Sequence, residues 1–240
     1  MPDIAPLPCA RCVGRPLNLC GSLAGPQLAH LLSLGGMRRW KKRETLFRAG
    51  DVMGAFFKIR SGIVAVSRVL DDGRRQIVAL RAPGDCVGYL EDDGRYTFEG
   101  QALTEVEACA FDRRQFDAFA ATTPALAAAT AEALAAALRQ SGQAMLVLGQ
   151  LNSTERAAHF LVEIDALYRD RQVSGEPLSL FMSRNEIADY LGLTLETVSR
   201  AFGKLKNQGL IRLVGADKVL ILDRAKLCAM GKFVEWRRQS

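Results

Sequence analysis

The segment MSRNEIADYLGLTLETVSRAFGKLKNQGLI, residues 182–211, carries the start and stop signals of two short helices. Ser183 and the glutamate three residues later form a capping-box pattern, which predicts a helix that begins there and ends at Gly192. Thr194 can cap a second helix, and Gly209 lies where that helix is expected to end. Two short helices joined by a tight turn are typical of the helix-turn-helix, whose second helix enters the major groove of DNA.

The residues that follow this segment support the same interpretation. The runs LIRLV and KVLIL flank a Gly-Ala-Asp turn at 215–217, which predicts a β-hairpin wing. Residues 170–240 contain 12 Lys and Arg against 8 Asp and Glu, so this part of the chain is positively charged and suited to a polyanion.

The second predicted helix has a face with the chemistry to read bases. Glu196, Ser199 and Arg200 are spaced i, i+3 and i+4, so they share one face near the N-terminal end of the helix. Arg can donate two hydrogen bonds to guanine, Glu can accept one from cytosine, and Ser can serve several bases or a phosphate. The alternative is an ordinary ion pair between Glu196 and Arg200 on a solvated helix. Further DNA contacts are expected from Arg184, Thr194, Thr197, Lys204, Lys206 and Arg212.

Residues 44–120 consist of short apolar runs separated by turn signals. The runs IVAVSRV and RQIVALRA lie on either side of Asp71-Asp72-Gly73, which predicts an antiparallel hairpin. Several such runs at regular spacing predict a small antiparallel barrel or jelly roll.

A long helical stretch follows. Pro124 opens a segment rich in Ala and Leu that continues to Tyr168 without another proline, which predicts one long helix or two helices joined near 149–153. Apolar residues recur every three or four positions from Leu126 to Leu148 and form a narrow stripe. Such a stripe suits pairing with a second copy of the chain, although it would equally serve to cover the β domain of the same chain.

The composition limits the class of protein. A chain of 240 residues allows one or two domains, and its net charge of +6 favours polyanionic partners. No apolar run approaches the roughly 18 to 20 residues that span a bilayer, and the N-terminus lacks the layout of a signal peptide, so we expect a cytoplasmic protein. Paired carboxylates, a nucleophile triad and a phosphate loop are all missing from the sequence, so we do not expect an enzyme.

The cysteines are unevenly distributed. Cys9, Cys12 and Cys20 lie in residues 1–26, called the arm below, whose many Pro and Gly residues predict a lack of regular structure. In a reducing compartment, closely spaced cysteines indicate metal or redox chemistry before a structural disulfide. The spacing alone leaves open a zinc site, a redox disulfide and inert thiols. Cys86 and Cys228 stand alone in the sequence and are expected to be small buried residues.

Taken together, the motifs LFRAGD, FFKIRSG, PGDCVGY and QALTEVEACAF, the long helix and residues 182–211 resemble the CRP/FNR superfamily of bacterial transcription regulators, in that family's order. The resemblance implies an α+β chain with an antiparallel, jelly-roll-like β-roll sensor domain, a dimerisation helix and a winged helix-turn-helix. The corresponding parts are an arm at 1–26, a sensor domain at 27–122, a dimerisation helix at 123–150 and a DNA-binding domain at 151–240. It also implies a homodimer on palindromic double-stranded DNA.

Within the superfamily, the chain is similar to the FNR branch. The stretch DDGRYTFEGQAL has Tyr96, Thr97 and Glu99 where a cationic phosphate cradle would be needed, so we do not expect a cyclic nucleotide to bind. The arm resembles the cysteine cluster of the FNR branch. This resemblance implies a [4Fe-4S] cluster with a fixed set of ligands, namely Cys9, Cys12, Cys20 and Cys109.

The resemblance also implies an activity. The cluster would stabilise the dimer that binds a TTGAT-N4-ATCAA-like palindrome at low oxygen, and loss of the cluster in oxygen would switch the protein off. As an activator, the dimer would also contact RNA polymerase. A zinc-bound or thiol redox sensor, a nitric oxide sensor, and a haem with His30 as axial ligand remain as alternatives on the same fold.

Overall fold

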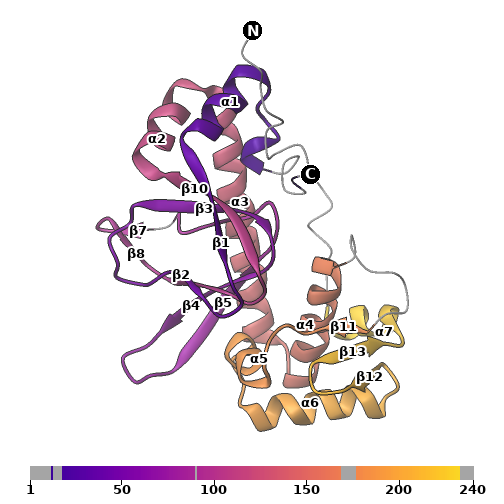
Figure 1. Ribbon diagram of the computed structural model, residues 1–240. Helices are drawn as coiled ribbons and strands as arrows, with labels where there is room; N and C mark the ends of the chain where they lie inside the picture. The colour runs from indigo at the N-terminus through magenta and orange to yellow at the C-terminus, as the bar shows by residue number, and fades with distance from the viewer. Residues whose placement is uncertain (1–11, 13–17, 90, 169–176, 233–240) are drawn as a thin grey trace. The chain divides into compact units, whose positions relative to one another are not determined.

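The computed structural model describes residue 12 and residues 18–89, 91–168 and 177–232. Its contacts divide the chain into two compact units, residues 1–141 and residues 142–240. The first unit is built on strands and the second mainly on helices, as Figure 1 shows.

Two four-stranded antiparallel sheets form the centre of the first unit. One has the order β1-β10-β3-β6, with strands β1 (Gly35–Trp40), β10 (Val106–Asp112), β3 (Ala55–Ser61) and β6 (Cys86–Val87). The other has the order β2-β9-β4-β5, with strands β2 (Thr45–Phe47), β9 (Glu99–Ala102), β4 (Val64–Val69) and β5 (Arg75–Arg81). A small hairpin joins β7 (Glu91–Asp92) to β8 (Arg95–Tyr96). The predicted β-roll is therefore confirmed, although its first strand begins at Gly35, before the expected residue 44.

The hairpin predicted from the Asp-Asp-Gly turn is also present. Strands β4 and β5 pair from Val64 with Arg81 to Val69 with Arg75. Gly73 has a φ of 84°, a left-handed conformation that costs glycine little because it has no Cβ.

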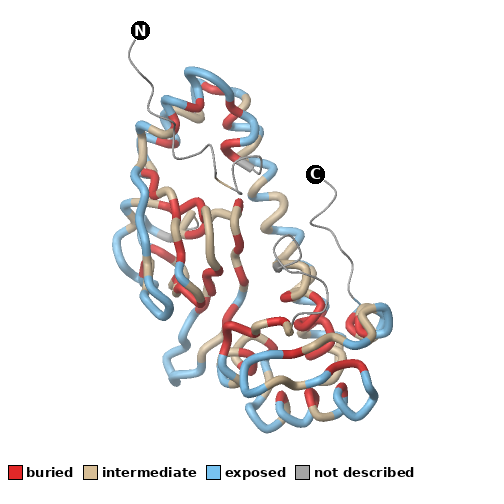
Figure 2. Tube along the Cα trace, turned by 45° about the vertical axis from the view of Figure 1, so that its right-hand side comes forward, coloured by how far each residue is buried: buried red, intermediate tan, exposed pale blue. Residues whose placement is uncertain are grey.

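Strand β3 separates two apolar cores because successive side chains point to opposite faces of a sheet. Phe57 and Ile59 lie in the core between the two sheets. Phe56 lies in a second core, on the other face, together with Leu19 and Cys20 of the arm. Figure 2 shows the buried residues of the strands in red.

Short helices cover the second core. They are a 3-10 helix (Asn18–Cys20), α1 (Gly25–Ser33) and α2 (Arg113–Thr122). The expectation that residues 1–26 lack regular structure was therefore wrong from Asn18 onward. Pro26 does not prevent α1 because it lies in the first turn, where a missing N–H leaves no hydrogen bond unmade.

The long helical stretch consists of two helices, one of the two predicted arrangements. Helix α3 (Pro124–Gln150) ends two residues before α4 (Ser153–Tyr168). Asn152 produces the break because its side-chain oxygen accepts hydrogen bonds from the N–H groups of Thr154 and Glu155 and so caps α4. Leu138 and Met145 of α3 are 72% and 73% exposed, so the predicted apolar stripe is largely uncovered in a single chain.

The second unit contains the helix-turn-helix. Helix α4 contacts α5 (Arg184–Leu191), α6 (Leu195–Asn207) and α7 (Arg224–Met230). A three-stranded sheet has the order β11-β13-β12, with strands β11 (Leu178–Ser179), β13 (Lys218–Ile221) and β12 (Ile211–Val214). Strands β12 and β13 form the hairpin predicted as the wing.

Within the described residues, no single helix is long and apolar enough to cross a membrane; α2 and α3, which meet at a bend of 119°, reach that length and composition only as a pair.

Candidate DNA-binding surface and sensor site

The turn between α5 and α6 is fixed by three local features that the sequence signals. The Ser183 hydroxyl accepts a hydrogen bond from the Glu186 N–H at 3.2 Å, and the Glu186 carboxylate accepts one from the Ser183 N–H at 2.7 Å. Gly192 ends α5 in the left-handed conformation, with a φ of 60°. The Thr194 hydroxyl then accepts a hydrogen bond from the Thr197 N–H and starts α6. These caps thus determine where α5 begins and ends and where α6 begins.

Helix α6 has one buried and one exposed face. The buried face consists of Val198, Ala201, Phe202 and Leu205. The opposite face exposes the side chains that the sequence predicted for base reading and phosphate binding, namely Glu196, Ser199, Arg200 and Lys204. Hydrogen bonding to its own backbone N–H and to the Thr194 hydroxyl lowers the pKa of Glu196, which keeps the carboxylate ready to accept a hydrogen bond.

Arg184 occupies a different environment from the other predicted contacts. Its guanidinium lies 4.0 Å from the centre of the Phe202 ring, so it is stacked between α5 and α6. Burial lowers the pKa of this group, and its Nη1 atom is buried without a hydrogen-bond partner among the described residues. Arg184 therefore contributes to packing, and its contact with DNA stays a prediction.

Arg156 on α4 is a residue that the sequence reasoning missed. Its guanidinium donates to three backbone carbonyls: Nε to Leu151 at 2.9 Å, Nη1 to Leu191 at 2.9 Å and Nη2 to Leu148 at 2.6 Å. Leu148 lies at the end of α3 and Leu191 at the end of α5, where carbonyls have no partner within the helix. One side chain thus ties the end of the long helix to the end of the first helix of the helix-turn-helix.

In the first unit, the predicted ligand Cys109 lies in a row of side chains across one sheet. The register pairs Met37 with Cys109, Cys109 with Lys58, and Lys58 with Cys86. Directly paired residues project from the same face of a sheet. This face also carries Phe56, and so it is the face on which the arm packs. We call it the arm face.

Described cysteines lie at two places on the arm face. Cys20 is buried in the second core, and Cys86 and Cys109 pack against that core. Cys12 lies beside Arg60, which is also near Cys109. The pKa of the Arg60 guanidinium is raised. Burial acts to lower this pKa, but a hydrogen bond with Cys12 and the proximity of Cys12 and Cys109 outweigh burial.

Cys86 differs from the isolated buried thiol that we expected. Burial, the largest cause, raises the pKa of its thiol to about 12, and the positive charge of Lys58 acts in the opposite direction. Cys20 also contributes to this shift, so Cys86 lies close to one of the predicted ligands.

The described cysteines have the type of side chain that binds a metal group through thiolates. Soft thiolates are the ligands of iron-sulfur clusters and of structural zinc, and Cys12, Cys20 and Cys109 are all associated with the arm face. Among the described residues, no three His, Cys, Asp or Glu side chains gather closely enough to hold a metal ion. Cys9 lies outside the described residues.

The stretch DDGRYTFEGQAL was expected to lack a phosphate cradle. Its charged side chains pair with other groups of the same domain. The Glu99 carboxylate accepts a hydrogen bond from the Ser67 hydroxyl at 2.8 Å and lies 3.4 Å from Nε of Arg75. Arg95 donates to the backbone carbonyl of Gly50 at 2.7 Å. Both charged side chains of this stretch, Glu99 and Arg95, are therefore engaged with groups of the same domain.

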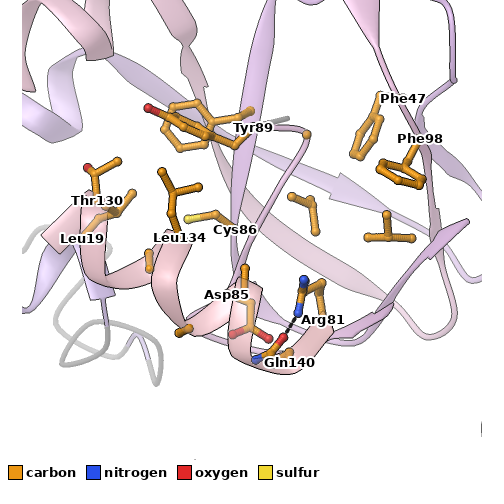
Figure 3. Close-up of a pocket in the computed structure, with 17 residues that line it drawn as sticks. Leu19, Phe47, Arg81, Asp85, Cys86, Tyr89, Phe98, Thr130, Leu134 and Gln140 are labelled. Carbon is orange, nitrogen blue, oxygen red and sulfur yellow. Dashed lines mark hydrogen bonds between the residues drawn. The ribbon is translucent and has the colours of Figure 1, made fainter. Parts of the chain in front are cut away.

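A cavity of about 890 Å³, including its open mouth, lies between the strands and α3 (Figure 3). Its walls are mainly apolar and include Phe47, Phe98 and Leu134. At one end, Arg81 donates a hydrogen bond to Gln140 of α3. The lining of the cavity holds one cation and one carboxylate, Arg81 and Asp85, among mainly apolar side chains.

Comparisons with known proteins agree with both halves of this description. Residues 37–123 match the family model of a cyclic nucleotide-binding domain, and residues 155–230 match that of a Crp-like helix-turn-helix domain. The nitrogen fixation regulation protein FixK of Bradyrhizobium diazoefficiens is 34% identical over 92% of this chain and 93% of its own. The transcriptional activator protein Anr of Pseudomonas aeruginosa is 38% identical over 80% of this chain and 79% of its own. The solved structure of FixK2 from Bradyrhizobium japonicum superposes with a TM-score of 0.74 and 32% identity, covering 84% of this chain and 99% of that one.

Proposed function

The chain belongs to the CRP/FNR family of DNA-binding transcription regulators, and we propose that it is a member that responds to oxygen through an iron-sulfur cluster. The family consists of transcription regulators, which are not enzymes. One observation carries the proposal. Cys12 and Cys20 of the arm and Cys109 of β10 are all associated with the arm face.

We assign the cluster to the thiolates of Cys9, Cys12, Cys20 and Cys109. A [4Fe-4S] cluster held there would supply a group that dioxygen attacks. Cys109 is fixed by the pairing of β10 with β1 and β3, whereas the other three cysteines belong to the arm. Holding the cluster would therefore hold the arm against the sheet.

The contacts of the arm provide a route from this site to the long helix. Leu19, Cys20 and Leu23 of the arm are buried in the same core as Leu126, near the start of α3. When the arm is held in place, this core keeps the start of α3 covered. The arm thus stabilises the helix that we propose to pair with its counterpart in a homodimer.

Pairing of α3 would cover the exposed apolar residues of its stripe. Leu134, Leu138 and Met145 lie at spacings that place them on one side of a helix. A two-fold dimer presents two copies of α6 to two half-sites, one turn of DNA apart. We propose that Glu196, Ser199 and Arg200 read TTGAT and ATCAA half-sites, and that the bound dimer contacts RNA polymerase.

We also propose that cyclic nucleotides do not regulate this protein. The internal pairing of Glu99 with Ser67 and Arg75, and the apolar walls of the cavity, support this view. Residues 37–123 match the cyclic nucleotide-binding model, and we propose that this match reflects a shared β-roll rather than a shared ligand.

The test is an absorption spectrum of protein purified without oxygen and followed while air is admitted, with iron, sulfide and zinc measured on the same sample. We expect a broad band near 400 nm, about four irons and four sulfides per chain, and bleaching in air as dimer and DNA binding are lost. A colourless protein with one zinc per chain and unchanged DNA binding in air would refute the oxygen-sensing proposal and leave the DNA-binding regulator intact.

A further inference from the structure

Strand β3 places two cations on the arm face. Lys58 and Arg60 are two residues apart, so they project from the same side of the sheet as Phe56. Lys58 is only 3% exposed, and the Arg60 side chain is 13% exposed. Lysine is rarely buried to this extent unless a charge or polar group is near it.

Lys58 is the direct neighbour of the predicted ligand. It pairs across the strands with Cys109 of β10 on one side and with Cys86 of β6 on the other. Paired Cα atoms in antiparallel sheets are about 4.5 to 5.5 Å apart, so the lysine stem starts beside Cys109 on the same face. Lys58 therefore shares its face of the sheet with Cys109, and its positive charge acts on the neighbouring Cys86 thiol.

The two cations have different local surroundings. Nη1 of Arg60 lies 3.6 Å from the Glu107 carboxylate, which in turn is 2.7 Å from Nε of Arg39. This group of charges reaches the rim of the sheet, where the Arg39 side chain is 72% exposed. Lys58, by contrast, lies in the interior, where water screens a charge least.

We propose that Lys58 is a positioning residue that offsets the negative charge of the thiolate-bound cluster and thereby sets how readily the cluster loses an electron to dioxygen. The inference rests on the proposed function. A cluster with four thiolate ligands carries net negative charge, and a nearby cation stabilises the more negative, reduced form. Removing the cation makes the loss of an electron easier; dioxygen accepts that electron and becomes superoxide.

The experiment compares four full-length proteins prepared without oxygen: wild type, Lys58→Met, Lys58→Arg and Lys42→Met. Methionine is of similar length to lysine but has no charge, and arginine keeps the charge. Lys42 is an exposed lysine of the same domain and is the matched control. For each protein, the reduction potential of the cluster and the rate of bleaching at a fixed oxygen concentration are measured.

We expect Lys58→Met to have a lower reduction potential and to bleach faster, by roughly threefold to tenfold, because an interior charge is lost. Lys58→Arg and Lys42→Met should stay within about twofold of the wild type. Equal potentials and equal rates in wild type and Lys58→Met would overturn the inference, while a wild type without any cluster would overturn the proposed function instead.

Thermal unfolding of the cluster-free proteins distinguishes this role from a structural one. Lys58 interacts with other groups inside the fold, and removing one partner of a buried interaction is destabilising. We therefore expect cluster-free Lys58→Met to unfold at a somewhat lower temperature than wild type, yet the variant should still bind the cluster, and Lys58→Arg should lose less stability. A variant that binds no cluster and melts well below the wild type would show that Lys58 is needed for folding, and the proposed role would be wrong.

Discussion

Replacing Arg156 by methionine should loosen the second unit measurably. The side chain donates three hydrogen bonds to the carbonyls of Leu148, Leu151 and Leu191. A hydrogen bond from a charged donor contributes about 1.5 to 3 kcal/mol when both groups are buried. Arg156 is only partly buried, so water would replace part of each bond after the change. We therefore expect a loss of about 3 kcal/mol in the free energy of unfolding of this unit.

Urea unfolding, followed by far-ultraviolet circular dichroism, measures this loss because helices dominate the second unit. Arg156→Lys should recover only part of it, since an ammonium cannot match the fork of a guanidinium. Arg212→Met, at an exposed arginine of the wing, is the control and should change stability by less than about 0.5 kcal/mol. A loss below about 1 kcal/mol for Arg156→Met would refute the view that this contact holds α5 to the end of α3.

Three further outcomes follow from the site. Arg200→Ala should lose discrimination at one guanine of the binding site by about 1 to 3 kcal/mol, measured by competition with base-substituted duplexes; an equal loss on all sequences would make Arg200 a phosphate contact. Cys20→Ser should lose the iron of the protein purified without oxygen, whereas Cys228→Ser should keep it; iron retained in Cys20→Ser would contradict the ligand set. Because burial raises the pKa of the Cys86 thiol to about 12, this thiol stays protonated at pH 8, and its alkylation, followed by mass spectrometry, should be slow at that pH; a rate at pH 8 equal to that of Cys228 would contradict this.

The helix-turn-helix was predictable because its signals are local. Ser183, Gly192 and Thr194 each determine the conformation of residues within one helical turn, and the structure confirms all three. The β4–β5 hairpin was predictable for the same reason, and two helices that meet near Asn152 were one of the two predicted arrangements of the long helical stretch. The bounds of the four predicted parts, the iron-sulfur cluster with all four of its cysteine ligands, and the DNA contacts remain predictions.

The features that sequence reasoning missed depend on contacts between distant parts of the chain. Lys58 meets Cys109 only because β3 pairs with β10 in one register, and no local pattern fixes that register. Arg156 resembles any helical arginine until the ends of α3 and α5 are brought to it. The 3-10 helix at Asn18–Cys20 was missed because the arm gains its structure from packing on Phe56 rather than from helix propensity.

The alternation along β3 has an evolutionary consequence. Phe57 and Ile59 maintain the barrel, while Phe56, Lys58 and Arg60 face the arm. Under the proposed function, mutations at Lys58 and Arg60 can change what the domain detects, whereas mutations at Phe57 and Ile59, or at the fully buried Phe56, change whether it folds. Selection can therefore act on signal specificity and on foldability through different residues of one seven-residue strand. A lineage could acquire a new stimulus by substitutions on one face without passing through unfolded intermediates.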